Sequence, residues 1–460
     1  MSAIAEEHLT TTSGRDVAVL AALATGFVMA MIDLTAVNLA LPAIAQDLSV
    51  PLSGLVWVVD GYTLTFAALL LAGGALADRL GAKRVYQAGL VVFLLGSIAC
   101  ALASSGVQLT VARFVQGSGA ALFMPSSLAL VGHAYPATKL RIRMVGIWSA
   151  MVGASSAVGP LVGGALVSAY GWRAVFWVNI PLGLIGLAMV QVLLSPPSRQ
   201  RNTISVVSHG LAIAVLSALT YALIEGPARG WTSTAVALSG LGTVAGAWML
   251  RYRDMNGIGP LVPSGLRRTG GFVAINTVGF LINCGAFGQL FFLSLYLQQA
   301  MGLSALGAGM HLLPLMITVT VGNLASSRVS ARLGLANTMK LGLAVGCAVG
   351  LVVVSLSALG VLGASELIAC VSVMNLAIGT AIPAMTASAM QIAGQVHANS
   401  AAAALNANRQ IGALVGVAAI GSVLHAVPVW NRSVPIAFVL VAAAYGIALV
   451  VVRRSLSSVR

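Results

Sequence analysis

Repeated apolar runs of about 20 residues are the feature that most limits what this chain can fold into. A run of this length suits a helix that crosses a membrane, and within hydrocarbon a helix satisfies its own backbone hydrogen bonds. The runs dominate the chain, since 59% of its 460 residues are hydrophobic and 7% are charged. We therefore predict an all-α polytopic membrane protein. Fourteen spans are predicted, with cores at 17–41, 54–76, 84–103, 109–132, 144–169, 173–194, 208–225, 233–250, 271–298, 305–326, 336–358, 365–390, 401–424 and 434–452.

The loops between these spans differ in their basic residues. Of the 24 Lys and Arg residues, Arg173, Arg229 and Arg432 are assigned to one side, Arg113 and Arg409 fall within spans, and all others are assigned to the opposite side. Basic loops stay in the cytoplasm, so we expect both termini there and an even number of spans. A twelve-span arrangement without the seventh and eighth would keep this parity. The net charge of +14 is spread over alternate loops, so it does not indicate a nucleic-acid partner.

The sequence also repeats itself. GGALADRLGAKR at 73–84 has a degraded echo in GNLASSRVSARLG at 322–334, and GSGAALFMPSS at 117–127 is echoed by GTAIPAMTAS at 379–388. The repeat relates spans 1–6 to spans 9–14 and leaves spans 7 and 8 as an inserted pair. Two repeats around a central cavity are typical of transporters, with the binding site between the repeats near the middle of the membrane.

This repeat predicts the domain organisation. We expect an N-terminal six-helix half at 1–200, an inserted helix pair at 201–260 and a C-terminal six-helix half at 261–460. The stretches 195–202 and 251–268 are polar or rich in Pro and Gly, and we interpret them as the linkers on either side of the inserted pair.

Asp33 lies within the first apolar run, in the stretch MIDLTAVNLALP at 31–42. A charge at the centre of a bilayer costs about 2.5–3.5 kcal/mol on insertion scales, and such a residue usually faces a bundle interior or a wet cavity. A function for this carboxylate is therefore the default expectation. The loop charges place it beyond the middle of its span, toward the outer leaflet.

The stretch GGALADRLGAKR, between spans 2 and 3, is the most specific motif. Its glycines allow helix ends to approach closely, and Asp78 can accept hydrogen bonds from a neighbouring helix N-terminus or a basic side chain. Anchoring by positive loops explains the basic residues without any further role, but not the spacing of the glycines and the acid. The residues that we assign to a conformational motif are Gly74, Asp78, Arg79, Gly81, Lys83 and Arg84.

A second motif, GASSAVGPLVGG at 153–164, lies in span 5. Small residues every few positions permit tight helix–helix contact, and the proline removes a backbone donor and bends the helix. Close packing alone is a sufficient physical explanation for this pattern. The residues of this motif are Gly153, Gly159, Pro160, Gly163 and Gly164.

These motifs resemble those of the major facilitator superfamily. The loop motif is similar to the family's G-x-L-a-D-r-x-G-r-k-r, except at Ala82, where a basic residue is usual. The span 5 motif looks like G-x-x-x-x-x-G-P-x-x-G-G of the family's antiporters. The stretch I-D-x-T-x-V-N-x-A-L-P, which contains Asp33, resembles the first helix of the fourteen-helix drug:proton antiporters, and the resemblance covers nearly the whole chain.

The resemblance implies a fold and a function. The fold is the major facilitator fold, with two six-helix repeats, an inserted helix pair and fourteen transmembrane helices. The function is proton-coupled export of hydrophobic drugs or antibiotics, cationic ones included, by alternating access across a bacterial cytoplasmic membrane. The family pattern maps proton coupling to Asp33, Asp60 and Arg113. Asp60 can instead simply favour a helix N-terminus, and Arg113 can extend to the membrane surface.

Polar and aromatic side chains within the spans are candidates for lining a substrate cavity, although such residues more often pack in a core or face lipid. A lone histidine in a span is more often a hydrogen-bonded packing residue than a ligand. Arg409 is interpreted as structural, and Glu225 and Glu366 as interfacial. The cavity candidates are Asn38, Trp57, Tyr62, Gln289, Phe292, Tyr296 and His311.

Other functions remain as alternatives to drug export. A proton-coupled importer or a lipid or metabolite transporter could use the same fold, because a fold does not fix substrate or direction. A membrane receptor without transport activity is a further alternative. An enzyme is not expected, since no paired catalytic residues are evident. The four cysteines lie within apolar runs without metal-ligand spacing, so we expect no metal and no cofactor besides the proton gradient.

Overall fold

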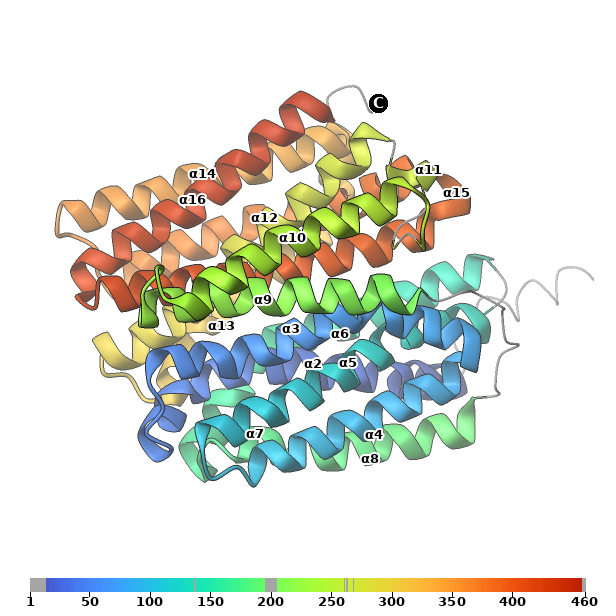
Figure 1. Ribbon diagram of the computed structural model, residues 1–460, viewed down its shortest axis with the longest axis horizontal. Coiled ribbons are helices and arrows are strands. Elements are labelled where there is room, and N and C mark those ends of the chain that lie inside the picture. Colours follow the sequence, from blue (N-terminus) through green and yellow to red (C-terminus); the bar gives the residue numbers. More distant parts are fainter. Residues whose placement is uncertain are drawn as a thin grey trace, which may run out of the picture.

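The computed structural model describes residues 14–135, 138–194, 205–259, 261, 264–267 and 269–456. This part of the chain is all-helical and contains no β-strand, and most of its helices run along one common direction (Figure 1). The N-terminal helices are α2 (Gly14–Asp47), α3 (Leu52–Leu80), α4 (Ala82–Ala101), α5 (Gly106–Ala134), α6 (Thr138–Tyr170), α7 (Ala174–Trp177) and α8 (Asn179–Leu193).

Two long helices and a short one connect these to the C-terminal half. They are α9 (Val206–Arg229), α10 (Thr234–Met255) and α11 (Ser264–Arg267). The C-terminal helices are α12 (Gly270–Leu295), which continues as the π-helical turn η1 (Tyr296–Ala300), α13 (Ala305–Leu333), α14 (Leu335–Ala358), α15 (Ala364–Ala426) and α16 (Trp430–Ser455).

Each of the fourteen predicted spans coincides with a helix of the described chain. The short α7 and α8 together form the sixth span. The long α15 holds the twelfth and thirteenth, because at Gly394 the backbone leaves the helix with φ of 65°, a conformation that favours glycine. Twelve stretches of the described chain are long and apolar enough to cross a membrane, and α6 and α10, with 33 and 22 residues, have sufficient length. The predicted fold class is confirmed, while the linker predicted at 195–202 lies outside the described residues.

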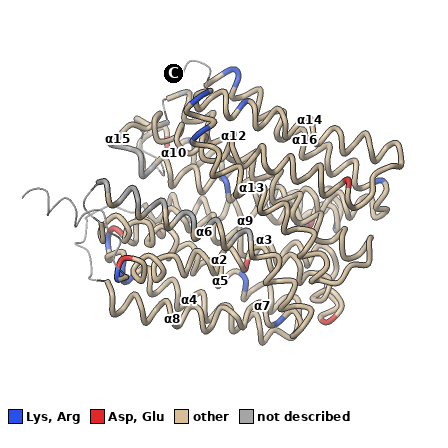
Figure 2. Tube along the Cα trace, turned by 180° about the vertical axis from the view of Figure 1, so that it is seen from behind, with Lys and Arg blue, Asp and Glu red and all other residues tan. Residues whose placement is uncertain are grey.

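The first and last described helices define the two ends of the bundle. We call the end where α2 begins and α16 ends the termini end, and the opposite end the far end (Figure 1). Figure 2 shows that charged residues gather at the two ends with few between them, and that Lys and Arg cluster mainly at the termini end. This distribution is the one that the loop charges indicate. The location of the termini end in the cytoplasm stays a prediction.

The two halves repeat the same helix contacts. In the N-terminal half α3 and α4 pack against α5, and in the C-terminal half α13 and α14 pack against α15. A Cβ atom at Gly73 would meet the backbone oxygen of Ala121, and one at Gly322 would meet that of Leu376. Both motif-bearing helices therefore approach their partner through a glycine, and the echo in the sequence corresponds to a repeated contact. The boundaries at 1–200, 201–260 and 261–460 stay predictions.

The halves also contact one another, and several of these contacts lie toward the far end. Ser294 of α12 donates a hydrogen bond from its hydroxyl to the backbone oxygen of Asn38 in α2, at 2.6 Å. The backbone N–H of Leu306 in α13 donates to the hydroxyl of Ser168 in α6, at 3.0 Å. These bonds hold the two halves together at the far end.

The inserted pair covers the junction between the halves. Of this pair, α9 packs against both α3 and α15, whereas α10 packs mainly against α9 (Figure 1). Trp57 of α3 donates from Nε1 to the carboxylate of Glu225 in α9 at 2.9 Å, and Arg229 pairs with the same carboxylate at 2.6 Å. Glu225 was predicted to be merely interfacial, but it ties α9 to the N-terminal half.

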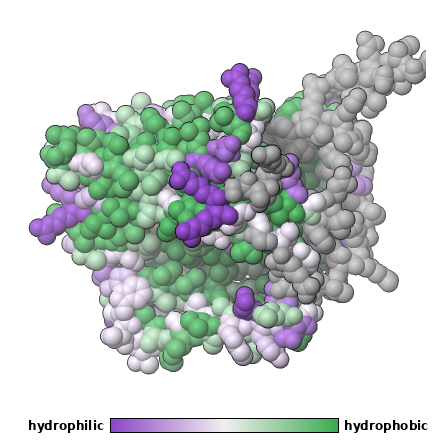
Figure 3. Space-filling view, turned by 90° about the horizontal axis from the view of Figure 1, so that it is seen from above, coloured by the Kyte–Doolittle hydropathy of each residue, from purple (hydrophilic) through white to green (hydrophobic). Residues whose placement is uncertain are grey.

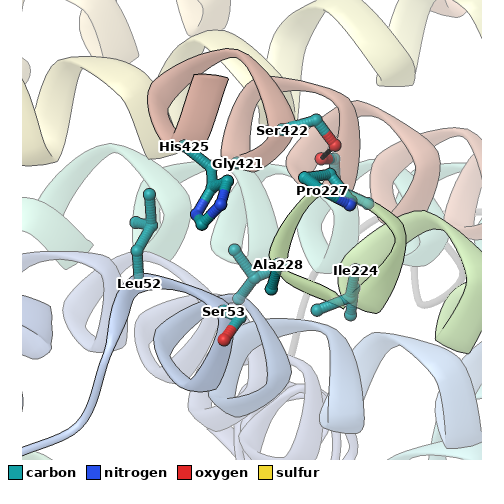
Figure 4. Close-up of a pocket in the computed structure, with 10 residues that line it drawn as sticks. Leu52, Ser53, Ile224, Pro227, Ala228, Gly421, Ser422 and His425 are labelled. Atoms are coloured by element: carbon teal, nitrogen blue, oxygen red, sulfur yellow. Dashed lines mark hydrogen bonds between the residues drawn. The ribbon is translucent and has the colours of Figure 1, made fainter. Parts of the chain in front are cut away.

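A small pocket marks the place where α3, α9 and α15 meet at the far end. Figure 4 shows Ser53, Pro227 and His425 around it, one from each helix. Its free volume is about 10 Å³, close to the least that holds one water molecule. The pocket is therefore too small for an organic compound.

The outer surface of the bundle is apolar. Figure 3 shows the face over α14 and α16, where hydrophobic side chains predominate and hydrophilic ones form limited patches. Leu351 and Val352 of α14 and Ile447 and Val450 of α16 are among the exposed side chains. A face on which apolar side chains predominate suits contact with lipid rather than water.

Candidate transport site

A buried ion pair connects α2 to α5. Arg113 donates from Nη1 to the carboxylate of Asp33 at 2.5 Å, and the two side chains are 1% and 0% exposed. Arg113 also donates from Nε to the backbone oxygen of Val58 in α3, at 3.0 Å. Buried charges are tolerated when they are paired and hydrogen-bonded. The ion pair therefore offsets the cost of placing Asp33 within a membrane span.

Gln116, one turn after Arg113 on α5, bonds to both members of the pair. Its Oε1 accepts from Arg113 at 2.6 Å, and its Nε2 donates to Asp33 at 3.0 Å. The same Nε2 donates to the hydroxyl of Ser97 in α4 at 3.2 Å, and this hydroxyl accepts from Asn179 of α8 at 2.9 Å. The network thus joins α2, α3, α4, α5 and α8 around one carboxylate.

Two aromatic rings enclose the guanidinium of Arg113. Its central carbon lies 4.5 Å from the ring centroid of Tyr62 and 5.9 Å from that of Phe176. Both distances are within the range of a cation–π interaction. Tyr62 was predicted to line a substrate cavity, but it is 0% exposed. It forms part of the surroundings of Arg113 instead.

Asp60 does not share this network. It is 0% exposed on α3, and neither carboxylate oxygen has a hydrogen-bond partner among the described residues. Val56, one turn earlier, packs against Gly421 of α15, so Asp60 lies close to the junction of the halves. A buried carboxylate without a partner is costly, and Asp60 therefore remains a candidate for proton coupling, separate from Asp33 in this conformation.

The small-residue motif of α6 packs directly beside Asp33. A Cβ atom at Gly159 would meet the hydroxyl oxygen of Thr35, and one at Gly163 would meet the backbone of Ala36. Thr35 and Ala36 follow Asp33 by two and three residues on α2. The prediction that the motif permits close helix packing is confirmed at these two positions.

The same motif contacts the C-terminal half. A Cβ atom at Gly164 would meet the backbone oxygen of Ala305, and one at Gly309 would meet that of Pro160. Helix α6 therefore packs against α2 on one side and α13 on the other. The surroundings of Gly153 lie outside the described residues.

The loop motif joins α3 to α4 at the termini end. Gly81 has φ of 97° and separates the two helices, a turn that favours glycine. Lys83 donates to the backbone oxygens of Leu194 and Gln191, at 2.7 and 3.1 Å, where it bonds to free carbonyls at the end of α8. Asp78, Arg79 and Arg84 lie in the helix ends on either side of Gly81.

The two adjacent glycines near the end of α3 have different surroundings. A Cβ atom at Gly74 would meet only Pro125, at the ordinary contact distance of 3.8 Å, whereas one at Gly73 would meet the backbone of Ala121. The expected close approach therefore occurs at Gly73, the first glycine of the motif, while the assignment of Gly74 to the conformational motif stays a prediction.

Comparison with known proteins agrees with this geometry. Residues 23–417 match the sequence model of the Major Facilitator Superfamily. This chain belongs to the Major Facilitator Superfamily. Its relatives include the methylenomycin A resistance proteins of Bacillus subtilis (strain 168), 43% identical over 96% of this chain and 94% of that protein, and of Streptomyces coelicolor, 44% identical over 93% and 89%. The multidrug resistance protein Stp of Mycobacterium tuberculosis is 32% identical over 87% and 74%.

Solved structures share the fold of this protein. A crystal structure of the peptide transporter POT in complex with sulfate superposes with a TM-score of 0.72 and covers 96% of this chain and 94% of that one. At 16% identity, this likeness shows the fold alone. The family match, together with this fold, identifies the protein as a multi-pass membrane transporter.

The remaining predicted cavity residues of this facilitator divide into two groups. Asn38 and Trp57 lie toward the far end, where Asn38 accepts from Ser294 through its backbone and Trp57 binds Glu225. His311 is partly buried, and its Nδ1 contacts the backbone oxygen of Gly307 at 2.8 Å. These contacts are compatible with packing roles.

The aromatic candidates of the C-terminal half lie in its core. Phe292 is 0% exposed and stacks on Tyr296 with centroids 5.8 Å apart, and both rings contact Trp430. Phe292 is therefore a core residue rather than a cavity lining. Gln289 donates to Asn375 at 2.8 Å and is 3% exposed.

Sequence reasoning missed three residues of the site. Gln116, Ser97 and Asn179 are polar side chains within apolar runs, and that property alone could have marked them as candidates. Their contribution depends on a meeting of α4, α5 and α8 that the sequence does not specify. As for metals, the described residues bring together no group of three or more His, Cys, Asp or Glu side chains.

Proposed function

We propose that this transporter exports hydrophobic, antibiotic-like compounds across the bacterial cytoplasmic membrane in exchange for protons. Relatives named for resistance to methylenomycin A and to multiple drugs support the direction and the substrate class, and they match along most of this chain. The single observation that carries the proton coupling is the buried ion pair of Asp33 and Arg113.

Protonation of Asp33 supplies the switch in this proposal. A proton on the carboxylate removes its charge and weakens its bond to Arg113, which keeps its bonds to Val58 and Gln116. Helix α6 contacts α2 immediately after Asp33 and contacts α13 on its other side. A change at the ion pair is thereby passed to the junction between the halves.

The proton gradient provides enough free energy for export. One unit of pH difference corresponds to about 1.4 kcal/mol per proton, and moving one charge through 100 mV adds about 2.3 kcal/mol. One or two protons per cycle therefore support appreciable accumulation outside the cell. In this scheme the termini end faces the cytoplasm, and the far-end bonds between the halves must break to release the compound.

Export by everted membrane vesicles tests the proposal. Vesicles energised with a proton gradient are given a panel of compounds that includes methylenomycin A, and uptake is measured for the wild type and for Asp33→Asn. We expect the wild type to accumulate at least one compound, and Asp33→Asn to lose gradient-driven uptake, because its side chain cannot exchange a proton.

A second acidic residue provides a matched control. Asp47 pairs with Arg173 at 2.6 Å, but the side chains are 47% and 41% exposed. Exposed ion pairs are worth about 0–1 kcal/mol, so Asp47→Asn should retain uptake. Undiminished gradient-driven uptake by Asp33→Asn would contradict the proposed coupling. Gradient-driven transport out of the everted vesicles would favour an importer.

A further inference from the structure

The C-terminal half contains a partly buried cation, Arg409, that forms no ion pair with the described residues. Within residues 261–460 Glu366 is the only acidic residue, and it lies at the start of α15, at the far end, where Ser365 donates to it. Arg409 lies in the second part of α15, Ala401–Ala426, eight residues from its start at the termini end. That distance is about 12 Å along a helix, so Glu366 and Arg409 lie toward opposite ends of the bundle.

The side chain of Arg409 lies inside the bundle rather than in lipid. Its Cγ atom lies beside Gly279 of α12, together with Leu405 and Met385 from the two parts of α15. Leu405 and Met385 are 2% and 0% exposed. Arg409 itself is only partly buried, but its Nε is buried and has no hydrogen-bond partner among the described residues.

The two acidic residues within the described spans of the N-terminal half do not supply a partner either. Asp33 is already paired with Arg113. Val56 on α3 lies against Gly421 on α15, and the two helices run in opposite directions. Asp60 follows Val56 by four residues and Arg409 precedes Gly421 by twelve, so they differ in depth by about 12 Å. Because helical side chains incline toward the helix N-terminus, Arg409 points away from Asp60.

The residues before and after Arg409 on α15 carry amide side chains. Asn408 donates from Nδ2 to Oδ1 of Asn276 in α12 at 2.9 Å. Gln410 has a buried Oε1 without a hydrogen-bond partner among the described residues. A guanidinium is always charged and its paired N–H groups match the two oxygens of a carboxylate. The guanidinium of Arg409 therefore has the chemistry to bind an anion such as a carboxylate.

We propose that Arg409 binds the carboxylate of an anionic substrate, so that this transporter prefers hydrophobic carboxylic acids. This inference rests on the proposed function and narrows its substrate class, which initially included cationic compounds. It also replaces the interpretation of Arg409 as a structural residue.

Equilibrium binding of two related dyes tests the carboxylate preference. Rhodamine B carries a free carboxylate, and its ethyl ester carries an uncharged ester in the same position on the same ring system. Binding is measured by fluorescence on the purified full-length protein in phosphatidylcholine nanodiscs without a proton gradient. We expect the wild type to bind rhodamine B about tenfold more tightly than the ester, which is the effect of one charge-assisted hydrogen bond.

Substitutions at Arg409 test whether this residue causes the preference for the carboxylate. Arg409→Gln should bind the two dyes with similar affinity, whereas Arg409→Lys should keep part of the preference because it keeps the charge. Arg332→Gln is the matched control, since Arg332 is exposed at the end of α13 and its loss removes the same charge near the termini end. This control should keep the full tenfold preference.

Several outcomes would overturn the inference. Equal binding of both dyes by the wild type, or an unchanged preference in Arg409→Gln, would exclude a carboxylate site at Arg409. If phosphatidylglycerol in the nanodiscs displaces rhodamine B from the wild type but not from Arg409→Gln, the bound anion is a lipid phosphate and the substrate assignment is wrong. The proposed function fails separately, when energised vesicles show no export.

Discussion

Two ion pairs of this chain show how the surroundings of a residue decide its role. Asp33–Arg113 and Asp47–Arg173 have nearly equal distances, but the first is almost fully buried and the second is largely exposed. Water screens the exposed pair, while the buried pair depends on every hydrogen bond that it makes. Gln116 provides two of those bonds, so it positions the pair without carrying a charge itself.

Gln116→Leu tests this positioning role. Leucine has a similar volume but leaves Asp33 and Ser97 without their amide partner. Each unsatisfied buried group costs about 1–3 kcal/mol, so we expect a lower melting temperature in detergent and weaker proton-driven uptake. Gln108→Leu is the control, because Gln108 is exposed and bonds only to neighbouring serines. Equal melting temperatures for the two variants would contradict the role of Gln116.

At the scale of elements, α6 is the helix that links the ion pair to the opposite half. Its glycines allow backbone contact with α2 near Asp33 and with α13 across the junction. A side chain at such a position forces the helices apart, because closely packed interiors do not yield freely. Tight packing of α6 thus provides a physical reason for the antiporter motif.

Replacement of Gly163 and of Gly132 by alanine tests how much the stability depends on this packing. Gly163→Ala would place a methyl group 2.5 Å from the backbone of Ala36, so we expect a loss of about 1–3 kcal/mol of stability and reduced uptake. Gly132→Ala on α5 is the control, since no atom lies within 4 Å of its added Cβ, and it should be neutral or slightly stabilising. If thermal unfolding of the purified variants shows the same midpoint, close contact at Gly163 is not important.

The elements could be predicted from the sequence far better than the site. A membrane span needs a long apolar run, so length and hydropathy were sufficient to place the helices, including the break in α15. The site depends on pairings between distant segments. Asp33 and Arg113 are separated by 80 residues, and their pairing follows from how α2 and α5 pack, which the sequence pattern does not encode. Gly73 and Gly74 are adjacent residues of the same type, so the sequence alone does not show which of them contacts α5.

At the scale of the whole molecule, the proposed export cycle requires the two halves to separate at the far end. The bond from Leu306 to Ser168 crosses between the halves at that end. The backbone nitrogen of Leu306 lies 3.0 Å from the Ser168 hydroxyl, so the two residues are neighbours across the junction and are a suitable pair for a cysteine cross-link, whose Cα atoms are usually about 4.4–6.8 Å apart. A covalent bond there would prevent the far end from opening.

Cross-linking therefore tests alternating access directly. In a background without the native cysteines, Ser168→Cys with Leu306→Cys should lose uptake on oxidation and regain it on reduction. Ser330→Cys with Thr338→Cys is the matched control, because these hydroxyls are 3.2 Å apart within the C-terminal half. A bridge inside one half moves with it as a unit and should leave uptake intact. Full uptake by the oxidised Ser168–Leu306 pair, with the cross-link verified by mass spectrometry, would show that the far end need not open.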